Sequence, residues 1–192
     1  MADLQDKWDA LYQQADPASC SAAAVLSEHA FLLPNQGTAL DLACGLGANA
    51  IFLAQQGLAV TASDCSQVAI AKLDAYCTAQ GLSVTACQQQ ITANSFTKQC
   101  FDVIVVSRFL DRGLTDAIID ALKPDGLLFY QTFTREKVAP GSPSNPDYLL
   151  AENELLRLFS PLRTVFYQEN ALLGKKHYGL RNEAQFIGQK RH

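Results

Sequence analysis

The residues best suited to chemistry lie in one stretch, 38–50, which reads TALDLACGLGANA. Its first residues are small and apolar and predict a buried strand that contains one acid, Asp41. Gly45 and Gly47 then form a turn before a helix that begins near Ala48. Such glycines let a ligand lie against the backbone because no Cβ stands in the way, and the exposed amides of a helix start favour polar or anionic groups. The stretch therefore predicts a site for a nucleotide-like ligand.

A second acid, Asp64, follows Gly45 by nineteen residues. The residues between them predict a helix and then a strand, so Asp64 stands at the carboxyl end of that strand. A Gly-x-Gly-x-x-Ala turn followed by such an acid is the pattern of nucleotide-binding βαβ units, in which the carboxylate accepts hydrogen bonds from ribose hydroxyls. Two interpretations share these features: a dinucleotide-dependent oxidoreductase and an S-adenosylmethionine (SAM) methyltransferase.

Helices and strands alternate along most of the chain. The patterns predict strands at 39–43, 58–62, 83–89, 101–107, 127–133, 162–169 and 178–188, and helices at 3–14, 18–31, 48–56, 66–80, 114–122 and 152–159. This alternation favours a parallel sheet with helices on both faces. The last two strands have no helix between them, so we expect antiparallel neighbours. Residues 134–147 are rich in Pro, Gly and Ser and predict a mobile loop near the site.

The chain of 192 residues suits one domain, 1–192, and we expect residues 1–33 to form an N-terminal helical cover. A net charge of −4 disfavours nucleic acid as a substrate. No apolar run approaches the roughly 20 residues that span a bilayer. The charged N-terminus does not resemble a signal peptide, so we expect a cytoplasmic protein without membrane contact. Six cysteines without a CxxC pair predict neither a disulfide nor a metal site.

Three observations favour the methyltransferase interpretation. Asp41 lies inside the first strand, where an oxidoreductase usually keeps apolar residues; the chain leaves little room for a substrate domain; and the sheet ends in an antiparallel pair.

Several ordered stretches then resemble the motifs of class I SAM-dependent methyltransferases: LDLACGLGANAIFLA, VTASD, FDVIVVSRFL and LKPDGLLFY. The later stretches YLLAENELLRLFSPLRTVFYQE and RNEAQFIGQK resemble small bacterial methyltransferases grouped with tellurite-resistance methyltransferases.

The resemblance implies an α/β fold with a Rossmann-like seven-stranded sheet of order 3-2-1-4-5-7-6, the last strand antiparallel and helices on both faces. It implies SAM as the cofactor and S-adenosyl-L-homocysteine as the product. Asp41 would fix the methionine amino end, Asp64 would bind the ribose, Cys65 would border the adenine, and residues 89–91 would face it where the family commonly has an acid. The cofactor-binding residues implied are Asp41, Cys44, Gly45, Gly47, Asp64, Cys65, Gln89, Gln90, Ile91 and Ser107.

The acceptor side offers three candidate catalytic residues. Arg108 could clamp an anionic acceptor through paired hydrogen bonds, with a surface salt bridge as an equal alternative. Tyr148 closes the long loop and could gate the transferring methyl, and His177 could act as a general base or be an ordinary loop histidine. The Asn/Asp-Pro-Pro-aromatic motif of base-amine methylation is absent from residues 107–109.

We therefore predict transfer of a methyl group from SAM to a small-molecule acceptor by in-line displacement. A non-catalytic SAM-binding sensor or partner subunit is the alternative, and an NAD-dependent oxidoreductase is less favoured. The sequence predicts no oligomeric state.

Overall fold

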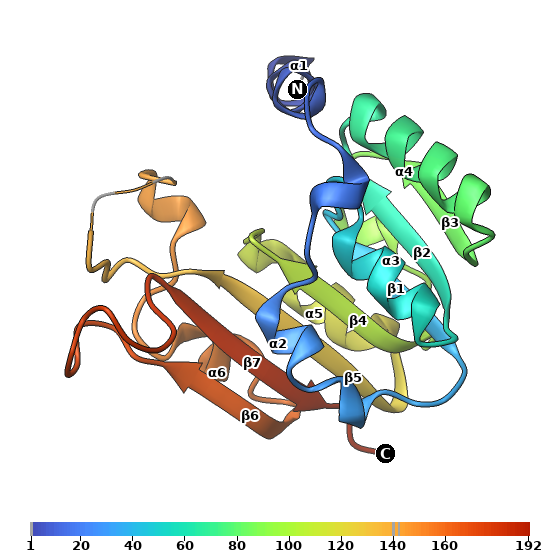
Figure 1. The fold of residues 1–192 in the computed structure, drawn as a ribbon. Coiled ribbons are helices and arrows are strands. Elements are labelled where there is room, and N and C mark those ends of the chain that lie inside the picture. Colours follow the sequence, from blue (N-terminus) through green and yellow to red (C-terminus); the bar gives the residue numbers. More distant parts are fainter. Residues whose placement is uncertain (1, 140, 142) are drawn as a thin grey trace.

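A seven-stranded sheet forms the centre of the computed structural model, which describes residues 2–139, 141 and 143–192 (Figure 1). The strands are β1 (Thr38–Leu42), β2 (Ala59–Asp64), β3 (Val84–Gln88), β4 (Phe101–Ser107), β5 (Leu122–Phe133), β6 (Arg163–Glu169) and β7 (Glu183–Gln189). Their order is β3-β2-β1-β4-β5-β7-β6. Strands β1 to β5 pair in parallel, and β7 is antiparallel to both β5 and β6. The predicted strand order and antiparallel last strand are confirmed.

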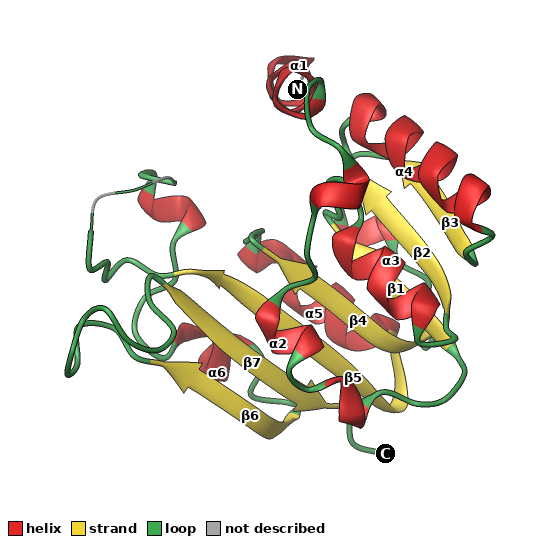
Figure 2. Cartoon of the chain, viewed as in Figure 1, coloured by secondary structure: helices red, strands yellow, loops and turns green. Residues whose placement is uncertain are grey.

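Helices cover both faces of the sheet (Figure 2). One face carries α2 (Ala24–Ser27), α3 (Ala48–Gln55) and α4 (Gln67–Gln80), and the other carries α5 (Thr115–Ala121) and α6 (Glu154–Leu158). Helix α1 (Ala2–Tyr12) lies beside α4. Short 3-10 turns are η1 (Pro17–Ser19), η2 (Ala30–Leu32), η3 (Ala93–Ser95), η4 (Arg112–Leu114) and η5 (Pro146–Tyr148). Within the described residues, no helix combines the length and the apolar character that crossing a membrane requires.

The two halves of the core follow from the alternation of side chains along each strand. In β4, Ile104 and Val106 pack toward α5 and α6, whereas Val103 and Val105 pack toward α2, α3 and α4. All four side chains are fully buried. A strand covered on both faces needs apolar residues at successive positions, which is why β4 reads as a continuous apolar run.

The predicted helix 18–31 is wrong. The chain instead forms η1, an extended segment, the four-residue α2 and then η2. Two of its backbone amides are held by distant side chains: the Ala23 amide donates to Asn49 Oδ1 and the Val25 amide to Gln131 Oε1, each at 2.9 Å. These tertiary hydrogen bonds outweigh the helix propensity of an alanine-rich sequence.

Two further boundaries differ from the predictions. Strand β7 begins at Glu183 rather than at 178, because the Arg181 side chain donates to the carbonyls of Asn170, Ala171, Lys175 and Tyr178 and keeps this segment in a loop. Strand β5 begins at Leu122 rather than at 127, so residues 123–126 lie within it, where the register with β4 shifts. Asp125 adopts φ +63° there, a left-handed conformation that aspartate tolerates better than most residues.

Helices α1 and α4 cap each other. Asp9 of α1 accepts hydrogen bonds from Ser66 Oγ and from the Val68 amide at the start of α4. In return, Lys72 of α4 donates to three carbonyls at the end of α1, including that of Tyr12 at 2.9 Å. A carboxylate at a helix start and an ammonium at a helix end both stabilise the helix. The N-terminal helix is therefore docked through its polar side chains.

Gly188, near the end of β7, provides a test of the packing. A Cβ at this position would lie 2.6 Å from Phe186 Cε1 and 3.0 Å from Leu162 Cδ1, both on buried side chains. We expect Gly188→Ala to lower the free energy of unfolding by about 1–3 kcal/mol through overpacking, measured by urea denaturation. Adding Phe186→Leu removes the clashing ring edge, so the double variant should lose less than the sum of the two single variants. Additive losses would contradict this packing.

Candidate active site

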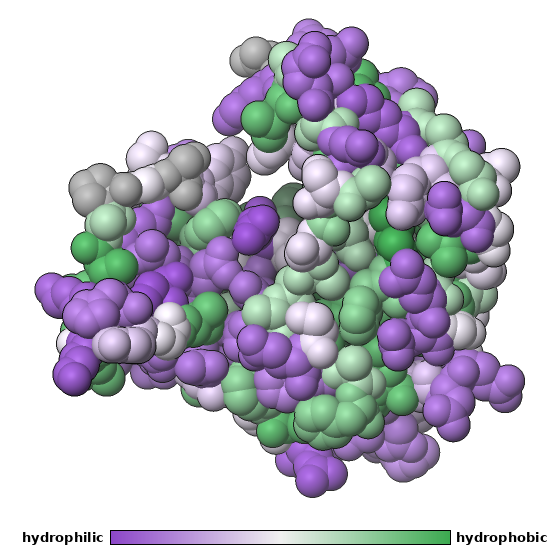
Figure 3. Space-filling model, in the orientation of Figure 1, coloured by the Kyte–Doolittle hydropathy of each residue, from purple (hydrophilic) through white to green (hydrophobic). Residues whose placement is uncertain are grey.

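The crevice at the carboxyl edge of the sheet lies between β1 and β4. The chain order reverses at this pair of strands, and parallel sheets bind ligands at such a switch point. The start of α3 and the end of β4 are joined directly, since Asn49 Nδ2 donates to Ser107 Oγ at 3.0 Å. Figure 3 shows a recess on this face of the molecule, below α1 and beside the lobe that carries the β5–α6 and β6–β7 connections.

The two glycines of the turn after β1 allow side chains from α1 and α4 to lie close to the backbone. Gly45 and Gly47 both have left-handed backbones, with φ of +52° and +75°. A Cβ on Gly47 would lie 2.4 Å from Leu73 Cδ1, so this glycine lets α3 pack against α4. A Cβ on Gly45 would lie 2.6 Å from Tyr12 Oη. The N-terminal helix thus brings a phenol over the turn, which the sequence patterns did not reveal.

Asp64 ends β2 at the predicted position, beside this turn. Its Oδ2 accepts from the Gly45 amide and its Oδ1 from the Ser66 amide, each at 2.8 Å. Each carboxylate oxygen keeps a further lone pair, so the group can still accept from ribose hydroxyls. Burial, and then the charge of Asp64, raises the pKa of Tyr12 well above its usual range. The phenol above the turn therefore remains a neutral hydrogen-bond donor.

Asp41 lies below the turn and is fully buried. Its Oδ2 accepts from the Ala50 amide at 3.0 Å, and its Oδ1 accepts from Asn49 Nδ2 at 3.3 Å. Burial raises the pKa of Asp41 to about 7, although these two hydrogen bonds oppose the shift, and the charge of Asp64 adds to it. The carboxylate contacts the first turn of α3, so it supports the glycine turn from inside the protein.

The predicted adenine-side residues are only partly brought together. The Gln89 amide donates to the Asp64 carbonyl and its side chain donates to Ser63 Oγ, each at 2.9 Å, so this residue adjoins the end of β2. Gln90 is exposed, and Ile91 packs against the core on the α5 face. Burial and the charge of Asp64 raise the pKa of Cys65 to about 11.

The thiol next to the glycine turn is protonated as well. Burial raises the pKa of Cys44 well above that of an ordinary thiol, and the charges of Asp41 and Asp64 reinforce the shift. Both cysteines of the predicted site thus present neutral sulfur.

Arg108 follows β4 at the far side of the crevice. Its amide donates to the Gln131 carbonyl at 2.8 Å, and its Nε lies 3.6 Å from Glu183 Oε1. Sequence reasoning missed Gln131 and Glu183. Their strands were predicted, but the pairing of β5 with β7 was needed to bring the two residues to the end of β4.

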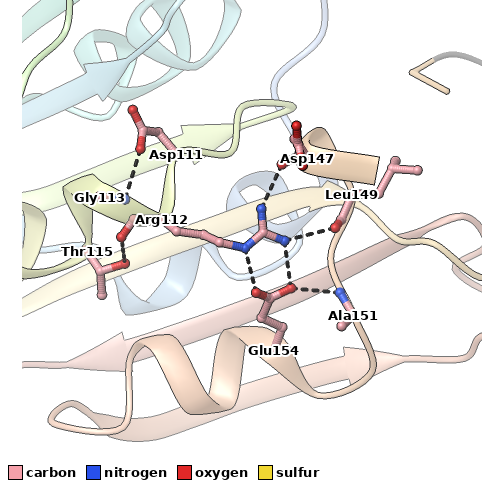
Figure 4. A network of polar contacts seen from close by, with 8 residues as sticks. All are labelled: Asp111, Arg112, Gly113, Thr115, Asp147, Leu149, Ala151 and Glu154. Carbon is pink, nitrogen blue, oxygen red and sulfur yellow. Dashed lines mark hydrogen bonds and ion pairs between the residues drawn. The ribbon is translucent and has the colours of Figure 1, made fainter. Parts of the chain in front are cut away.

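Arg112, in the same loop, has a structural role (Figure 4). Its Nε and one terminal nitrogen donate to both oxygens of Glu154, at 2.7 and 2.9 Å. The terminal nitrogens also donate to the carbonyls of Asp147 and Leu149, at 2.7 and 3.0 Å. Glu154 in turn accepts from the Ala151 amide at 2.7 Å. The arginine therefore fixes the end of the β5–α6 connection to the loop after β4.

The other two candidate catalytic residues lie in the β5–α6 and β6–β7 connections. Tyr148, in η5, is about half exposed, and His177 is exposed with its ring against Tyr178. In the described part of the chain, no hydrogen bond joins either side chain to the glycine turn. The predicted loop 134–147 includes residues 140 and 142, which lie outside the described residues. Among the residues described, no group of three or more His, Cys, Asp or Glu could hold a metal ion.

Comparison with known proteins points to methyl transfer. Residues 39–126, from β1 to the bulged part of β5, match a family model described as a methyltransferase domain. This match supports a class I SAM-dependent methyltransferase. The matched region includes the glycine turn, Asp64 and Arg108. No curated protein sequence matches the chain.

Solved structures of methyltransferases share the fold of this chain. TehB from Haemophilus influenzae is 20% identical with a TM-score of 0.74, covering 96% of this chain and 67% of its own. A TehB-like SAM-dependent methyltransferase from Corynebacterium glutamicum is 16% identical with a TM-score of 0.67, covering 100% of both chains. A SAM-dependent methyltransferase from Methanosarcina mazei is 18% identical with a TM-score of 0.65, covering 90% of this chain and 99% of its own. At these identities the likeness concerns the fold.

The raised pKa of Asp41 predicts a pH-dependent stability. Between the ordinary aspartate pKa of 3.8 and about 7, the folded protein holds a proton that the unfolded chain has released. The contribution of Asp41 is therefore full below the lower value and is lost as the pH rises through the upper one. We expect the unfolding free energy of the wild type, minus that of Asp41→Asn, to fall by a few kcal/mol from about pH 4 to about pH 8. Chemical denaturation across this range measures the difference, and a rise with pH would contradict the buried environment.

The Arg112–Glu154 contact predicts a measurable coupling. We expect Arg112→Gln to lower the unfolding free energy by about 1–3 kcal/mol, since four hydrogen bonds are lost from a partly buried group. Arg112→Lys should restore only part of this loss, because an ammonium cannot form the two-pronged contact. A double-mutant cycle with Glu154→Gln, followed by urea denaturation, should give a coupling above about 0.5 kcal/mol. Independent effects of the two substitutions would rule out this role.

Proposed function

We propose that this methyltransferase transfers the methyl group of SAM to a small-molecule acceptor by in-line displacement. The observation that carries the proposal is the crevice between β1 and β4, bordered by the Gly45 turn and Asp64 on one side and by Arg108 on the other. A net charge of −4 supports a small acceptor, because a nucleic-acid substrate calls for a broad basic surface.

In this proposal, the residues of the turn form the cofactor cradle. Asp64 accepts from the ribose hydroxyls, Gly45 and Gly47 allow the cofactor to lie against the backbone, and Cys44 and Cys65 border it with neutral thiols. Asp41 acts on the cofactor site through Asn49 and Ala50 rather than by contacting the cofactor itself. Its full burial supports this indirect role.

The other implied cofactor residues divide between the two ends of the cradle. Gln89 is the best-supported residue on the adenine side, because it contacts the end of β2. Gln90 and Ile91, the next two residues in the chain, complete this side in the proposal. Ser107 is assigned to the methionine end of the cofactor, and its hydrogen bond from Asn49 supports this assignment. Placing a nucleophile in line with the electrophilic methyl of SAM is then the main task of the protein.

Residues 1–33 cover the cradle in this proposal. The position of Tyr12 over Gly45 supports this role, as does the reciprocal capping of α1 and α4. Tyr148 and His177 are proposed to act from the acceptor side, as a gate and as a base when the nucleophile must lose a proton. Their exposure leaves room for such a role.

Turnover tests the reaction directly. Purified protein with SAM should release S-adenosyl-L-homocysteine in the presence of at least one member of a panel of thiol, amine and carboxylate acceptors. Tight SAM binding with no turnover on any acceptor would favour a non-catalytic sensor. Binding of NADH without binding of SAM would refute the proposal.

Asp64→Asn tests the cradle. The variant keeps one oxygen acceptor but loses the charge, so we expect SAM affinity to fall about tenfold to a hundredfold, from the loss of charge-assisted hydrogen bonds. Isothermal titration calorimetry measures the affinity, and circular dichroism checks the fold. Asp74→Asn, on the exposed side of α4, removes the same charge and is the matched control. Equal SAM affinity in both variants would remove Asp64 from the site.

A further inference from the structure

A buried row of polar side chains lies where β5 and β7 meet the crevice. Gln131 and Gln185 oppose each other across the two strands, and Gln185 Nε2 donates to Gln131 Oε1 at 3.0 Å. The same oxygen accepts from the Val25 amide, and Gln131 Nε2 donates to Glu183 Oε2. Both glutamines are buried, and the side chain of Glu183 is only 12% exposed. The row therefore holds the Glu183 carboxylate in one position.

The other oxygen of Glu183 faces Arg108. Glu183 Oε1 lies 3.6 Å from Arg108 Nε, and the arginine side chain is 71% exposed. Within the described residues, Glu183 is the only acidic group paired with Arg108, and no hydrogen bond from its terminal nitrogens is found. The 3.6 Å separation is an ion-pair contact rather than a hydrogen bond, so the charge of Glu183 attracts the guanidinium while its planar fork of donors stays available to a ligand.

The backbone of Arg108 is also held in an unusual conformation. Its φ is +53°, in the left-handed region that costs a non-glycine residue about 1–3 kcal/mol, and strain of this kind is concentrated at functional sites. The amide contact with the Gln131 carbonyl holds this conformation from β5. On the other side, Ser107 is tied to Asn49 at the start of α3. The position of Arg108 is thus set relative to the glycine turn.

The contrast with Arg112 separates a binding role from a structural one. Arg112 makes four short hydrogen bonds to Glu154 and two carbonyls, so its donors are satisfied within the protein. Arg108 has one long contact and most of its side chain in solvent. Glu183 is nearly buried, and both its oxygens face protein groups, which makes it a poor partner for a cationic acceptor.

We propose that Arg108, oriented by Glu183, is the acceptor subsite and that the acceptor is a small anion, a carboxylate or an oxyanion. This inference rests on the proposed methyltransferase function. Paired N–H donors of a guanidinium match two oxygens of such a group, and in a protein of net charge −4 a local cation is needed to attract it. Glu183 is a positioning residue, since it acts through Arg108.

Anion titration of the protein saturated with S-adenosyl-L-homocysteine tests the inference. The probes are sodium benzoate and sodium sulfate, with benzamide as the neutral control, and the readout is the Nε–Hε resonance of Arg108 in nitrogen-15 NMR spectra. We expect a saturable shift with at least one of the anions and none with benzamide. Arg108→Gln should weaken the affinity for that anion, followed by the remaining amide resonances, by about tenfold or more.

Two further variants separate orientation from charge. Glu183→Asp keeps the charge but withdraws the carboxylate, so we expect the Nε–Hε resonance to move in the free protein and the anion affinity to fall about fivefold. Lys176→Gln removes a positive charge from an exposed site in the β6–β7 connection and should leave the affinity within about twofold. Equal losses for Lys176→Gln and Arg108→Gln would overturn the subsite, as would non-saturable shifts in the wild type. An unchanged affinity in Glu183→Asp would overturn the role of Glu183.

Calorimetry with S-adenosyl-L-homocysteine, performed first, keeps the two proposals apart. Failure of this ligand to bind would contradict the methyltransferase function itself. Normal binding, together with failure of both anions to bind at Arg108, would overturn only the acceptor inference.

Discussion

The buried carboxylate of Asp41 joins the first strand to the helix that follows it, and the rest of the site is built outward from this contact. It holds the Ala50 amide and the Asn49 side chain at the start of α3. Asn49 then donates to Ser107 at the end of β4 and accepts from the Ala23 amide in the N-terminal segment. Three segments that are distant in sequence therefore meet below the glycine turn, and their separation is set from inside the protein.

This arrangement carries a cost in stability. A buried carboxylate is unfavourable in its charged form, and two hydrogen bonds only partly offset the burial of Asp41, as its raised pKa indicates. Arg108 at the opposite side of the crevice adds a left-handed backbone. Both features lie beside the switch point, while Val103 to Val106 of β4 supply ordinary apolar packing on either face. Both costs are therefore found where a cofactor and an acceptor would meet.

The sequence predicted the features that depend on local pattern. Strand β4, the glycine turn and Asp64 at the end of β2 are found at the predicted places, because periodicity and turn chemistry act over a few residues. The strand order came from resemblance to a family, since periodicity does not determine which strands are neighbours. The prediction of a helix at 18–31 failed because two backbone amides of this segment donate to the side chains of Asn49 and Gln131, which are 26 and 106 residues away in sequence. Glu183 was missed for the same reason: its contact with Arg108 exists only once β7 lies beside β5.

A crystal structure of the protein with S-adenosyl-L-homocysteine tests the central claim most directly, because it shows the cofactor and the remaining crevice together. The ribose hydroxyls should lie within hydrogen-bond distance of the Asp64 carboxylate, with the ligand against the backbone of Gly45. The sulfur should then lie at the crevice between the glycine turn and Arg108. Ligand bound elsewhere, with Asp64 and Gly45 making no contact to it, would contradict the cradle and the acceptor subsite that depends on it.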